Sequence, residues 1–326
     1  MLFRILALVI ACFLSSPSVR AAGFDCSKAA EGIEKLICAD PELSRLDSDL
    51  NAVFRSKSGR LAHEYCVAQS NWIQRRDACK DRLCVKGLYE TRINNISTVG
   101  KAAKDLGIAI DLCDQQNPTV FDIKTWPADP SQKIVVIANP AKDAGDDVVY
   151  DLYLLVQNGS DGKILRKAID KKIINLSKMD EYTSDDMGSV WIDTANYAIK
   201  KGKRALGVRI VSGHSGNPTV SHESLYLFDF QDPKMPPVLN MISSVSSGAT
   251  GTNEACFSSE WDRTIAIGQN ATNGYFDLIV TEKSMEGTDG ETMEDGNIDC
   301  ASTTSSKKYT LRFDGAHYVV PPDLKR

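Results

Sequence analysis

The 326-residue sequence is poor in the residues and patterns that mark most enzymes. It has only 4 histidines, and it lacks a phosphate-binding loop, a dinucleotide-binding fingerprint and a Cys-x-x-Cys pair. Residues 213–216 and 305–308 approach hydrolase motifs, but they lack the companion motifs and the strand-turn-helix setting that such enzymes need. We therefore expect no catalytic residues, no metal site and no cofactor.

Long apolar runs are confined to the start of the chain. Arg4, the apolar residues 5–14 and the small residues before a cleavage point after Ala21 are typical of a secretory signal peptide. No later stretch approaches the roughly 18 apolar residues that a membrane-spanning helix needs. The mature chain is thus expected to be periplasmic or secreted, with no transmembrane segment. Residues 9–12 also match the general form of a lipoprotein box, so a lipid anchor at Cys12 is an alternative.

Helical signals dominate residues 25–96. Asp40 can cap a helix whose first residue is Pro41, and Glu42 favours the positive end of the helix dipole. Apolar residues then recur every three or four positions, and further amphipathic stretches follow. Three or four antiparallel helices are predicted. About 70 residues bury too little apolar surface to be stable alone, so cysteines are expected to supply the missing stability.

Removal of residues 1–21 takes away Cys12 and leaves eight of the 9 cysteines. An even number in an exported chain indicates disulfides formed in an oxidising compartment. If the helix that begins at Pro41 lies antiparallel to the helix that ends near Cys79, then Cys38 is level with Cys79 and the two can pair. The favoured pairs are Cys38–Cys79, Cys26–Cys84, Cys66–Cys113 and Cys256–Cys300. The rival pairs are Cys26–Cys66 and Cys84–Cys113.

One ordered set of residues in the helical stretch resembles a known family. The set comprises Asp25, Leu43, Leu46, Asp47, Trp72, Arg76, Asp77, Tyr89 and Arg92, together with Cys26, Cys38, Cys79 and Cys84. In this order and spacing, residues 24–97 resemble the N-terminal domain of LprI-type lysozyme inhibitors. The resemblance implies an exported binding protein that protects the cell wall from lysozyme or a related muramidase. Cys66 is additional to the family pattern, and the chain beyond residue 97 lies outside it.

The same motif also has a purely structural interpretation. Trp72 and Tyr89 at helical spacing are typical of core positions. Arg76, Asp77 and Arg92 are suited to ion pairs or helix caps, because buried charges need partners. The motif therefore identifies a fold more surely than a binding surface.

After residue 117 the apolar pattern changes from helical spacing to alternation. About a dozen short strands separated by Gly, Pro, Asn and Ser turns predict a mostly antiparallel β-domain, a sandwich or alternatively a small propeller. We therefore predict an α+β chain of two domains: a small helical bundle held by disulfides in residues 22–108, and a β-rich domain in residues 109–326. Residues 193–209 resemble stretches of uncharacterised bacterial exported proteins, which names no activity.

Charge differs between the two halves of the mature chain. Residues 22–110 contain 14 basic and 12 acidic residues, whereas residues 111–326 contain 22 basic and 31 acidic residues. An acidic surface disfavours nucleic acid and attracts a cationic partner, although it also keeps many exported proteins in solution.

Two stretches rich in Ser and Gly are candidates for an inhibitory contact. A lysozyme inhibitor of this kind would insert a polar loop into the enzyme cleft, where the catalytic carboxylates accept hydrogen bonds. The candidate residues are Ser246, Ser247, Gly248, His214 and Ser215. A flexible neutral loop is the simpler interpretation. His214 with His222 could in principle bind zinc, but their spacing matches no established metal motif.

Two further functions stay open at this point. The helical domain could be a structural cap on a β-domain that binds an envelope glycan, a partner protein or a metal. Alternatively, the chain could be a periplasmic hydrolase. Lysozyme turnover on cell walls, measured with an excess of the protein, separates inhibition from both.

Overall fold

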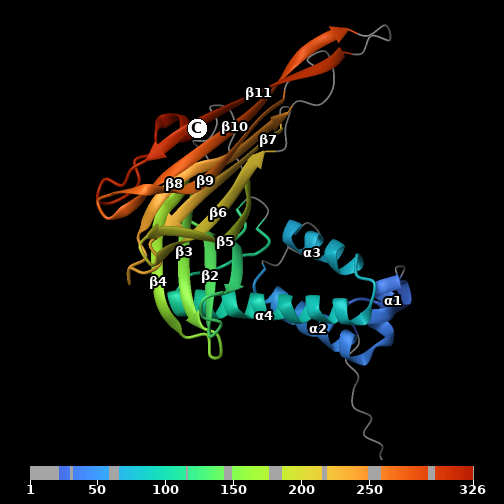
Figure 1. The fold of residues 1–326 in the computed structure, drawn as a ribbon. Coiled ribbons are helices and arrows are strands. Elements are labelled where there is room, and N and C mark those ends of the chain that lie inside the picture. Colours follow the sequence, from blue (N-terminus) through green and yellow to red (C-terminus); the bar gives the residue numbers. More distant parts are fainter. Residues whose placement is uncertain are drawn as a thin grey trace, which may run out of the picture. The chain divides into compact units, whose positions relative to one another are not determined.

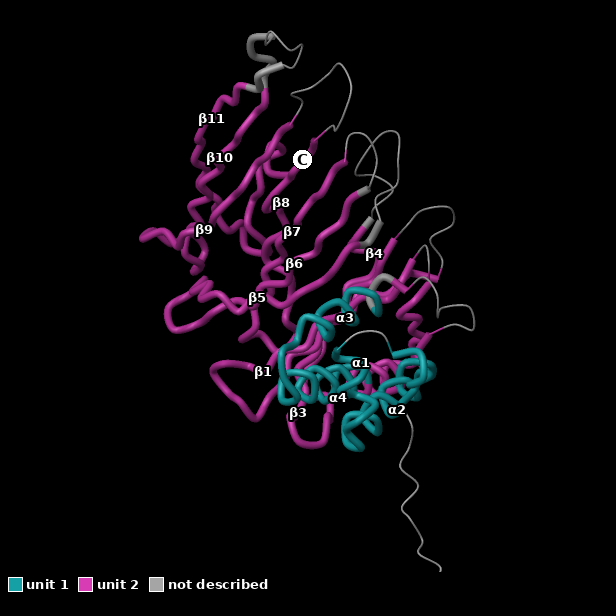
Figure 2. The backbone as a smooth tube through the Cα atoms, turned by 90° about the vertical axis from the view of Figure 1, so that its right-hand side faces the viewer, with its two compact units in different colours: residues 1–56, 67–96 teal, residues 57–66, 97–326 magenta. Residues whose placement is uncertain are grey.

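The computed structural model describes residues 22–29, 32–58, 66–114, 117–142, 149–175, 186–214, 219–248, 258–292 and 298–325. The chain divides into two compact units, residues 1–56 with 67–96 and residues 57–66 with 97–326 (Figure 2). The first unit is helical and the second contains two antiparallel sheets, which confirms the predicted α+β class with a sandwich. The division after residue 96 falls inside one helix, α4 (Arg82–Leu106). The boundary expected at residue 108 stays a prediction.

The helical unit contains α2 (Pro41–Arg55), whose start the sequence specifies. Asp40 accepts hydrogen bonds from the backbone N–H groups of Glu42 and Leu43 at 2.9 and 3.0 Å, as an N-cap does. The apolar face of α2 is buried through Leu43, Leu46, Leu50 and Phe54. The other elements are the 3-10 turn η1 (Cys26–Lys28), α1 (Gly32–Ala39) and α3 (Val67–Asp77), shown with α4 in Figure 1.

Helices α2 and α4 run in the same direction within this unit. Three contacts advance along both helices together: Arg82 with Asp40, Lys86 with Glu42, and Tyr89 with Asp47. If each helix is antiparallel to the next, α2 and α4 must run in the same direction, because α3 returns the chain between them.

Two of the predicted disulfides are wrong. Cys26 is bonded to Cys38, and Cys79 to Cys84, with Cα–Cα distances of 5.8 and 5.7 Å. These bonds replace the expected Cys38–Cys79 and Cys26–Cys84 pairs. The expectation failed because each cysteine has a nearer partner along the chain. The turn η1 brings Cys26 back to the last turn of α1, and the short link between α3 and α4 joins Cys79 to Cys84.

The third expected bond is present, since Cys66 and Cys113 are joined across 47 residues. This bond also excludes the rival pairs, which would have used the same two cysteines. Cys256 lies outside the described residues, so its pairing with Cys300 stays a prediction.

The second unit is a sandwich of two sheets in which consecutive strands are neighbours. One sheet has the order β1-β2-β3-β4, and the other has the order β11-β10-β9-β8-β7-β6-β5. The strands of the first are β1 (Val120–Thr125), β2 (Gln132–Pro140), β3 (Val149–Asn158) and β4 (Ile164–Asn175). Those of the second are β5 (Asp186–Lys200), β6 (Lys203–His214), β7 (Thr219–Phe228), β8 (Pro237–Gly248), β9 (Ser258–Thr272), β10 (Tyr275–Thr292) and β11 (Ile298–Leu311). Every pairing is antiparallel, as short turns between strands allow.

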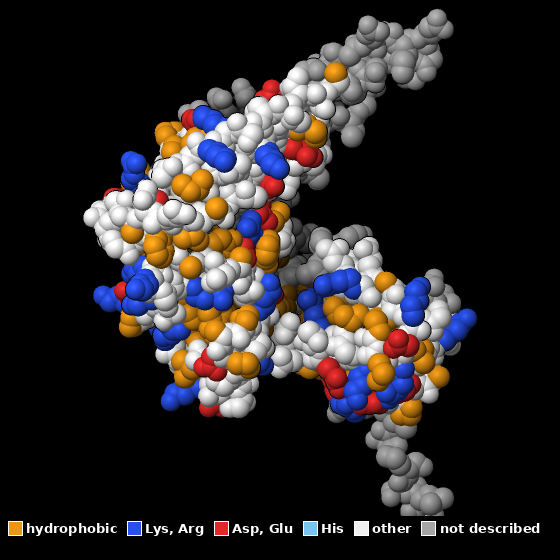
Figure 3. Space-filling model, viewed as in Figure 1, with side chains coloured by type: hydrophobic (Ala, Val, Ile, Leu, Met, Phe, Trp, Pro, Cys, Tyr) orange, Lys and Arg blue, Asp and Glu red, His pale blue; other side chains and the backbone are white. Residues whose placement is uncertain are grey.

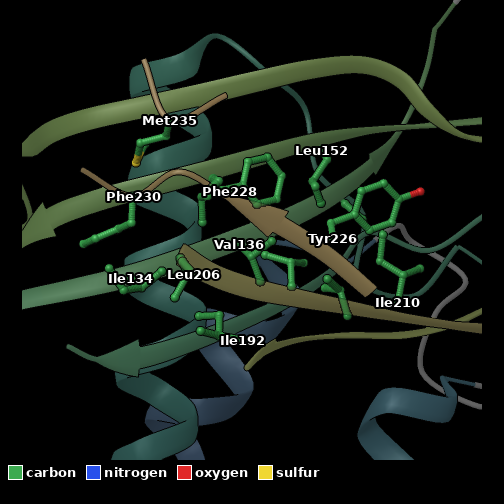
Figure 4. Close-up of a cluster of buried hydrophobic side chains, with 14 of the residues drawn as sticks. Ile134, Val136, Leu152, Ile192, Leu206, Ile210, Tyr226, Phe228, Phe230 and Met235 are labelled. Atoms are coloured by element: carbon green, nitrogen blue, oxygen red, sulfur yellow. The ribbon is translucent and has the colours of Figure 1, made fainter. Parts of the chain in front are cut away.

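An apolar cluster fills the space between the two sheets (Figure 4). Alternate residues of β2 and β3 meet alternate residues of β6 and β7, because successive side chains of a strand point to opposite faces. The labelled members include Ile134, Val136, Leu152, Leu206, Ile210 and Phe228.

Two more clusters cover the other faces of the sheets. Residues 97–106 of α4 lie on the outer face of the four-stranded sheet, where Val99 and Ala102 pack against Tyr153 and Leu155. On the seven-stranded sheet, Tyr226 and Phe228 of β7 belong to the core between the sheets. Leu225 and Leu227, which alternate with them along the strand, belong to a separate cluster. Both faces of this sheet are therefore apolar near β7.

One edge of the seven-stranded sheet is closed by side chains from the other sheet. The carboxylate of Asp122 on β1 accepts the backbone N–H of Ile192 on β5 at 2.9 Å. The ammonium group of Lys124 donates to the carbonyl oxygen of Ile192 at 2.5 Å. These two bonds satisfy backbone groups that an edge strand leaves open.

Arg263 on β9 fixes the C-terminal residues. Its side chain is 3% exposed and donates to the backbone carbonyl oxygens of Ile242 and Asp323 at 2.9 and 2.8 Å. It also bonds to the carboxylate of Glu282 at 2.7 Å. One guanidinium thus joins β8, β10 and the last turn, η3 (Pro322–Leu324).

Each helix within the described ranges is too short or too polar to span a bilayer. The expected signal peptide at residues 1–21, the alternative lipid anchor at Cys12, and Ser215 lie outside these ranges and stay predictions.

Candidate functional site

Three residues of the motif, Asp47, Arg76 and Tyr89, form one buried network in the helical unit. The phenol of Tyr89 on α4 donates to the carboxylate of Asp47 on α2 at 2.7 Å, and the guanidinium of Arg76 on α3 donates to the same phenol at 3.4 Å. Asp47 also accepts the backbone N–H of Gly23 at 2.5 Å. Three helices and the N-terminal segment therefore share one set of hydrogen bonds.

Aromatic packing surrounds this network. The rings of Trp72 and Tyr89 meet edge to face with centroids 5.1 Å apart, and the guanidinium of Arg76 lies 5.8 Å from the centre of the Trp72 ring. Arg76 also forms an ion pair with Asp77 at 2.7 Å. These contacts agree with the structural interpretation of the motif, in which Trp72 and Tyr89 are core residues and Arg76 and Asp77 form an ion pair.

Burial and hydrogen bonds together set the protonation states of Tyr89 and Arg76 in the network. Burial and then the Asp47 carboxylate raise the pKa of Tyr89, which keeps the phenol protonated as a donor. Burial lowers the pKa of Arg76, but its bonds to Asp77 and Tyr89 outweigh this and raise the pKa overall. Neither shift brings a pKa near neutrality, so these two groups are not suited to acid–base catalysis. With Asp47, Arg76 and Tyr89 only 7, 5 and 0% exposed, the network is not a contact surface.

The remaining motif residues stabilise the same fold. Leu43 and Leu46 are buried, and Asp25 caps η1 by accepting the backbone N–H and hydroxyl of Ser27 at 3.0 and 2.7 Å. Burial, with a smaller effect of a neighbouring arginine, lowers the pKa of Arg92 to about 10.

The link between α3 and α4 is an exposed feature of the helical unit. The Cys79–Cys84 bond closes residues 79–84 into a ring, which we call the α3–α4 ring. Asp81 in this ring caps α4, because its carboxylate accepts the backbone N–H of Cys84 at 2.9 Å. Leu83 is 75% exposed, the largest exposed fraction among the large hydrophobic side chains of the described residues.

Ion pairs anchor the α3–α4 ring to α2. Arg82 bonds to the carboxylate of Asp40 at 2.5 Å and to that of Glu42, and Glu42 also pairs with Lys86 at 2.7 Å. The disulfide and these bonds hold the ring in one conformation. Lys80 and Leu83 are both exposed on it. A rigid loop with a cation and an apolar side chain loses little conformational entropy when it binds a partner.

The sequence contained a signal for this ring that the interpretation above missed. Leu83 lies two residues before buried Val85, and therefore on nearly the opposite side of α4. An apolar residue at that position does not contribute to the core of the bundle.

The two predicted loop candidates lie at the same end of the seven-stranded sheet. His214 ends β6 opposite Val220 of β7, and Val220 lies opposite Ser247 of β8. Since neighbouring strands are about 4.8 Å apart, the backbones at His214 and Ser247 are about 10 Å apart. Ser246 is exposed, and the hydroxyl of Ser247 is 2.9 Å from that of Ser259. Their role in binding stays a prediction.

The β unit also contains a groove of about 550 Å³. It lies between the end of β4, the middle of β6 to β8, and the C-terminal segment. Its lining is mainly apolar and includes Ile173, Ile174, Ile210, Tyr226, Ile242 and Val319. A groove of this size and lining can hold a small apolar ligand.

A charged cluster occupies the half of the seven-stranded sheet near β5. Arg209 on β6 bonds to Asp193 at 2.8 Å and to Glu223, and the phenol of Tyr197 donates to Asp193 at 2.7 Å. Burial raises the pKa of Asp193, but these bonds outweigh it and lower the pKa overall. Burial and Asp193 raise the pKa of Tyr197 to about 12. Each charge has an opposite partner, so the cluster stabilises the sheet.

No group of three His, Cys, Asp or Glu side chains within the described ranges is placed to hold a metal ion.

The chain is similar to curated proteins called Lipoprotein LprI from Mycobacterium bovis and Mycobacterium tuberculosis. Each is 31% identical to it over 101 residues, which is 28% of this chain and 50% of the relative. The chain thus spans half the length of the curated relatives it matches. No family model and no solved structure matches the chain.

Proposed function

We propose that this chain is an exported binding protein that inhibits lysozyme or a related muramidase. The similarity to Lipoprotein LprI carries the proposal, because residues 24–97 resemble LprI-type inhibitors and the resemblance implies the same role. The three disulfides support export, since such bonds persist in oxidising compartments.

The α3–α4 ring is the contact that the geometry favours. Lysozyme-type enzymes carry two catalytic carboxylates in a cleft. The ammonium group of Lys80 is suited to such a carboxylate, and Leu83 is suited to an apolar subsite beside it. Because the ring is already fixed by Cys79–Cys84 and Arg82, few conformations are lost on binding. The predicted residues Ser246, Ser247, Gly248 and His214 form the alternative contact, on the β unit.

Lysozyme turnover on purified cell walls tests the proposal. Turnover is measured with and without a molar excess of the mature chain, residues 22–326. We expect the wild type to reduce turnover and the double variant Lys80→Ser, Leu83→Ser to restore it. The matched control is Lys283→Ser with Met285→Ser, which removes an exposed lysine and an apolar side chain that is 36% exposed from the β unit.

Full turnover in the presence of excess wild-type protein would rule out inhibition of that lysozyme. If inhibition persists in the Lys80, Leu83 variant but is lost in Ser246→Ala with Ser247→Ala, the contact lies on the β unit instead.

The apolar groove of the β unit favours a second candidate function, the binding of a small apolar envelope ligand. Its volume and lining match those of ligand sites more closely than a flat interface does. Titration with an apolar fluorescent probe tests this candidate. We expect saturable fluorescence with the wild type and a clear loss in Val319→Arg, whose side chain lines the groove and is 55% exposed, and no saturable signal would exclude the groove as a ligand site.

A further inference from the structure

The exposed side chains of β4 combine cations with aliphatic groups. This strand is an edge of the four-stranded sheet. Leu165 and Ile169 are 47% and 41% exposed. Lys163, Lys167 and Lys171 alternate with them along the chain and are exposed as well. We call these five residues the β4 surface.

Strand pairing explains why this surface is open. Lys167 lies opposite Leu155 of β3, and Ile169 lies opposite Tyr153, so all four side chains are on the outer face of the sheet. Residues 97–106 of α4 cover that face at β3, where Tyr153 and Leu155 are 3% and 0% exposed. The helix does not extend this cover over Lys167 and Ile169.

Positive charge is concentrated in this strand against the trend of its surroundings. Residues 163–172 contain five basic residues and one acidic residue, whereas residues 111–326 contain 22 basic and 31 acidic residues. Figure 3 shows Lys and Arg side chains interspersed with hydrophobic ones in this part of the β unit, at the left of the view.

Not all of these cations are available to a partner. Arg166 is turned inward and donates to the carbonyl oxygen of Phe230 at 2.6 Å, and Lys171 pairs with Asp151 at 2.6 Å. Lys163 and Lys167 form no ion pair with any residue in the described part of the chain. Both lysines are exposed, and each is two residues along the chain from an exposed Leu165 or Ile169.

We propose that the β4 surface docks the protein on an anionic lipid bilayer. The lysines approach the lipid phosphates, and Leu165 and Ile169 enter the boundary between head groups and acyl chains. Lysines that only protect an edge strand from pairing need no exposed Leu and Ile between them. A soluble anionic polymer offers no apolar layer for those two side chains, so the bilayer fits the whole surface.

Vesicle sedimentation of the mature chain, residues 22–326, tests this docking. Vesicles of phosphatidylcholine with phosphatidylglycerol are compared with vesicles of phosphatidylcholine alone, at low and high salt. We expect binding to the anionic vesicles only. Lys163→Ser with Lys167→Ser should weaken it about 25-fold at low salt, about fivefold for each lysine. Leu165→Ser with Ile169→Ser should remove the binding that survives high salt.

Matched controls change the same residue types elsewhere on the β unit. Lys201→Ser with Lys203→Ser removes two exposed lysines, one from the turn after β5 and one from the start of β6. Met285→Ser removes an apolar side chain that is 36% exposed. All of these positions are on the surface, so each variant should melt at the wild-type temperature.

Three results would overturn the docking proposal. The first is that the wild type binds anionic and neutral vesicles equally. The second is that the β4 variants and the control variants lose the same amount of binding. The third is that the Leu165, Ile169 variant binds vesicles like the wild type and that the protein binds soluble polyphosphate with equal affinity. The last result would mean recognition of charge alone. The lysozyme assay contains no lipid, so inhibition and docking can fail separately.

Discussion

The two units of the molecule reach stability by different means. The helical unit closes two short disulfides and places one polar network where three helices meet. Among its described residues, the β unit instead buries apolar clusters between its sheets and on their outer faces. The difference follows from size, because a small bundle buries too little apolar surface to be stable by packing alone. Single polar groups should therefore matter in the helical unit, and apolar volume in the β unit.

The largest effect should come from an apolar truncation in the β unit. Leu154 on β3 is 1% exposed in the core between the sheets. We expect Leu154→Ala to lower the free energy of unfolding of this unit by about 4 kcal/mol, because it leaves a cavity. Urea unfolding followed by the β-sheet circular dichroism signal measures this loss. Ile169→Ala, at an exposed position of β4, is the control, and an equal loss there would contradict the assignment of the core.

The next effect should come from the polar network of the helical unit. Asp47→Ala leaves the buried Tyr89 phenol and the Gly23 N–H without their acceptor, and it removes the anion that balances the buried Arg76 guanidinium through that phenol. We expect a loss of about 3 kcal/mol, measured by urea unfolding at the helical signal of 222 nm. Asp49→Ala on the same helix removes a more exposed ion pair with Arg45 and should cost only about 0.5 kcal/mol. Similar losses in both variants would mean that the network has no special role.

A smaller effect should follow from removal of the bond that closes the α3–α4 ring. Cys79→Ser with Cys84→Ser opens a loop with a sequence separation of 5 residues, so we expect a loss of about 2 kcal/mol in the helical unit. Thermal unfolding at 222 nm measures it. The β-sheet signal should be unchanged, and a matching loss there would show that the two units unfold together.

The smallest effect concerns pH and the charged cluster of the β unit. The pKa of Asp193 is lowered from 3.8 in the folded chain, so the unfolded chain binds more protons in acid. The contribution of Asp193 to stability is thus fully present above the unfolded pKa and is lost as the pH falls through the lowered folded pKa. The stability of the wild type should therefore fall more steeply below about pH 4 than that of Asp193→Asn. Parallel curves from urea titrations at each pH would contradict this.

Local features of the chain could be predicted, because their causes are local. The cap at Asp40, the proline after it and the alternation in the strands each depend on a few neighbouring residues. Trp72 and Tyr89, whose helical spacing is typical of core positions, are 3% and 0% exposed. The disulfides could not be predicted in this way. The prediction placed Cys38 beside Cys79 because two antiparallel helices would bring them to the same height, and it ignored the short segment that joins Cys79 to Cys84.

The exposed features could not be predicted for a related reason. A strand pattern shows that Lys167 and Ile169 share a face, but not whether a helix covers it. That depends on where α4 ends on the sheet, over Tyr153 and Leu155 rather than over Lys167 and Ile169. Leu83 is the exception, because its spacing of two residues from Val85 already places the two side chains on nearly opposite sides of α4.

The position of Arg263 sets a practical limit on how the protein can be shortened or tagged. Its guanidinium is held by the carbonyl of Asp323, only a few residues from the end of the sequence. A recombinant version cut before Pro322 would leave a buried cation short of an acceptor in the middle of the seven-stranded sheet. A recombinant version that retains Pro322–Leu324 and carries its affinity tag after Arg326 keeps that bond.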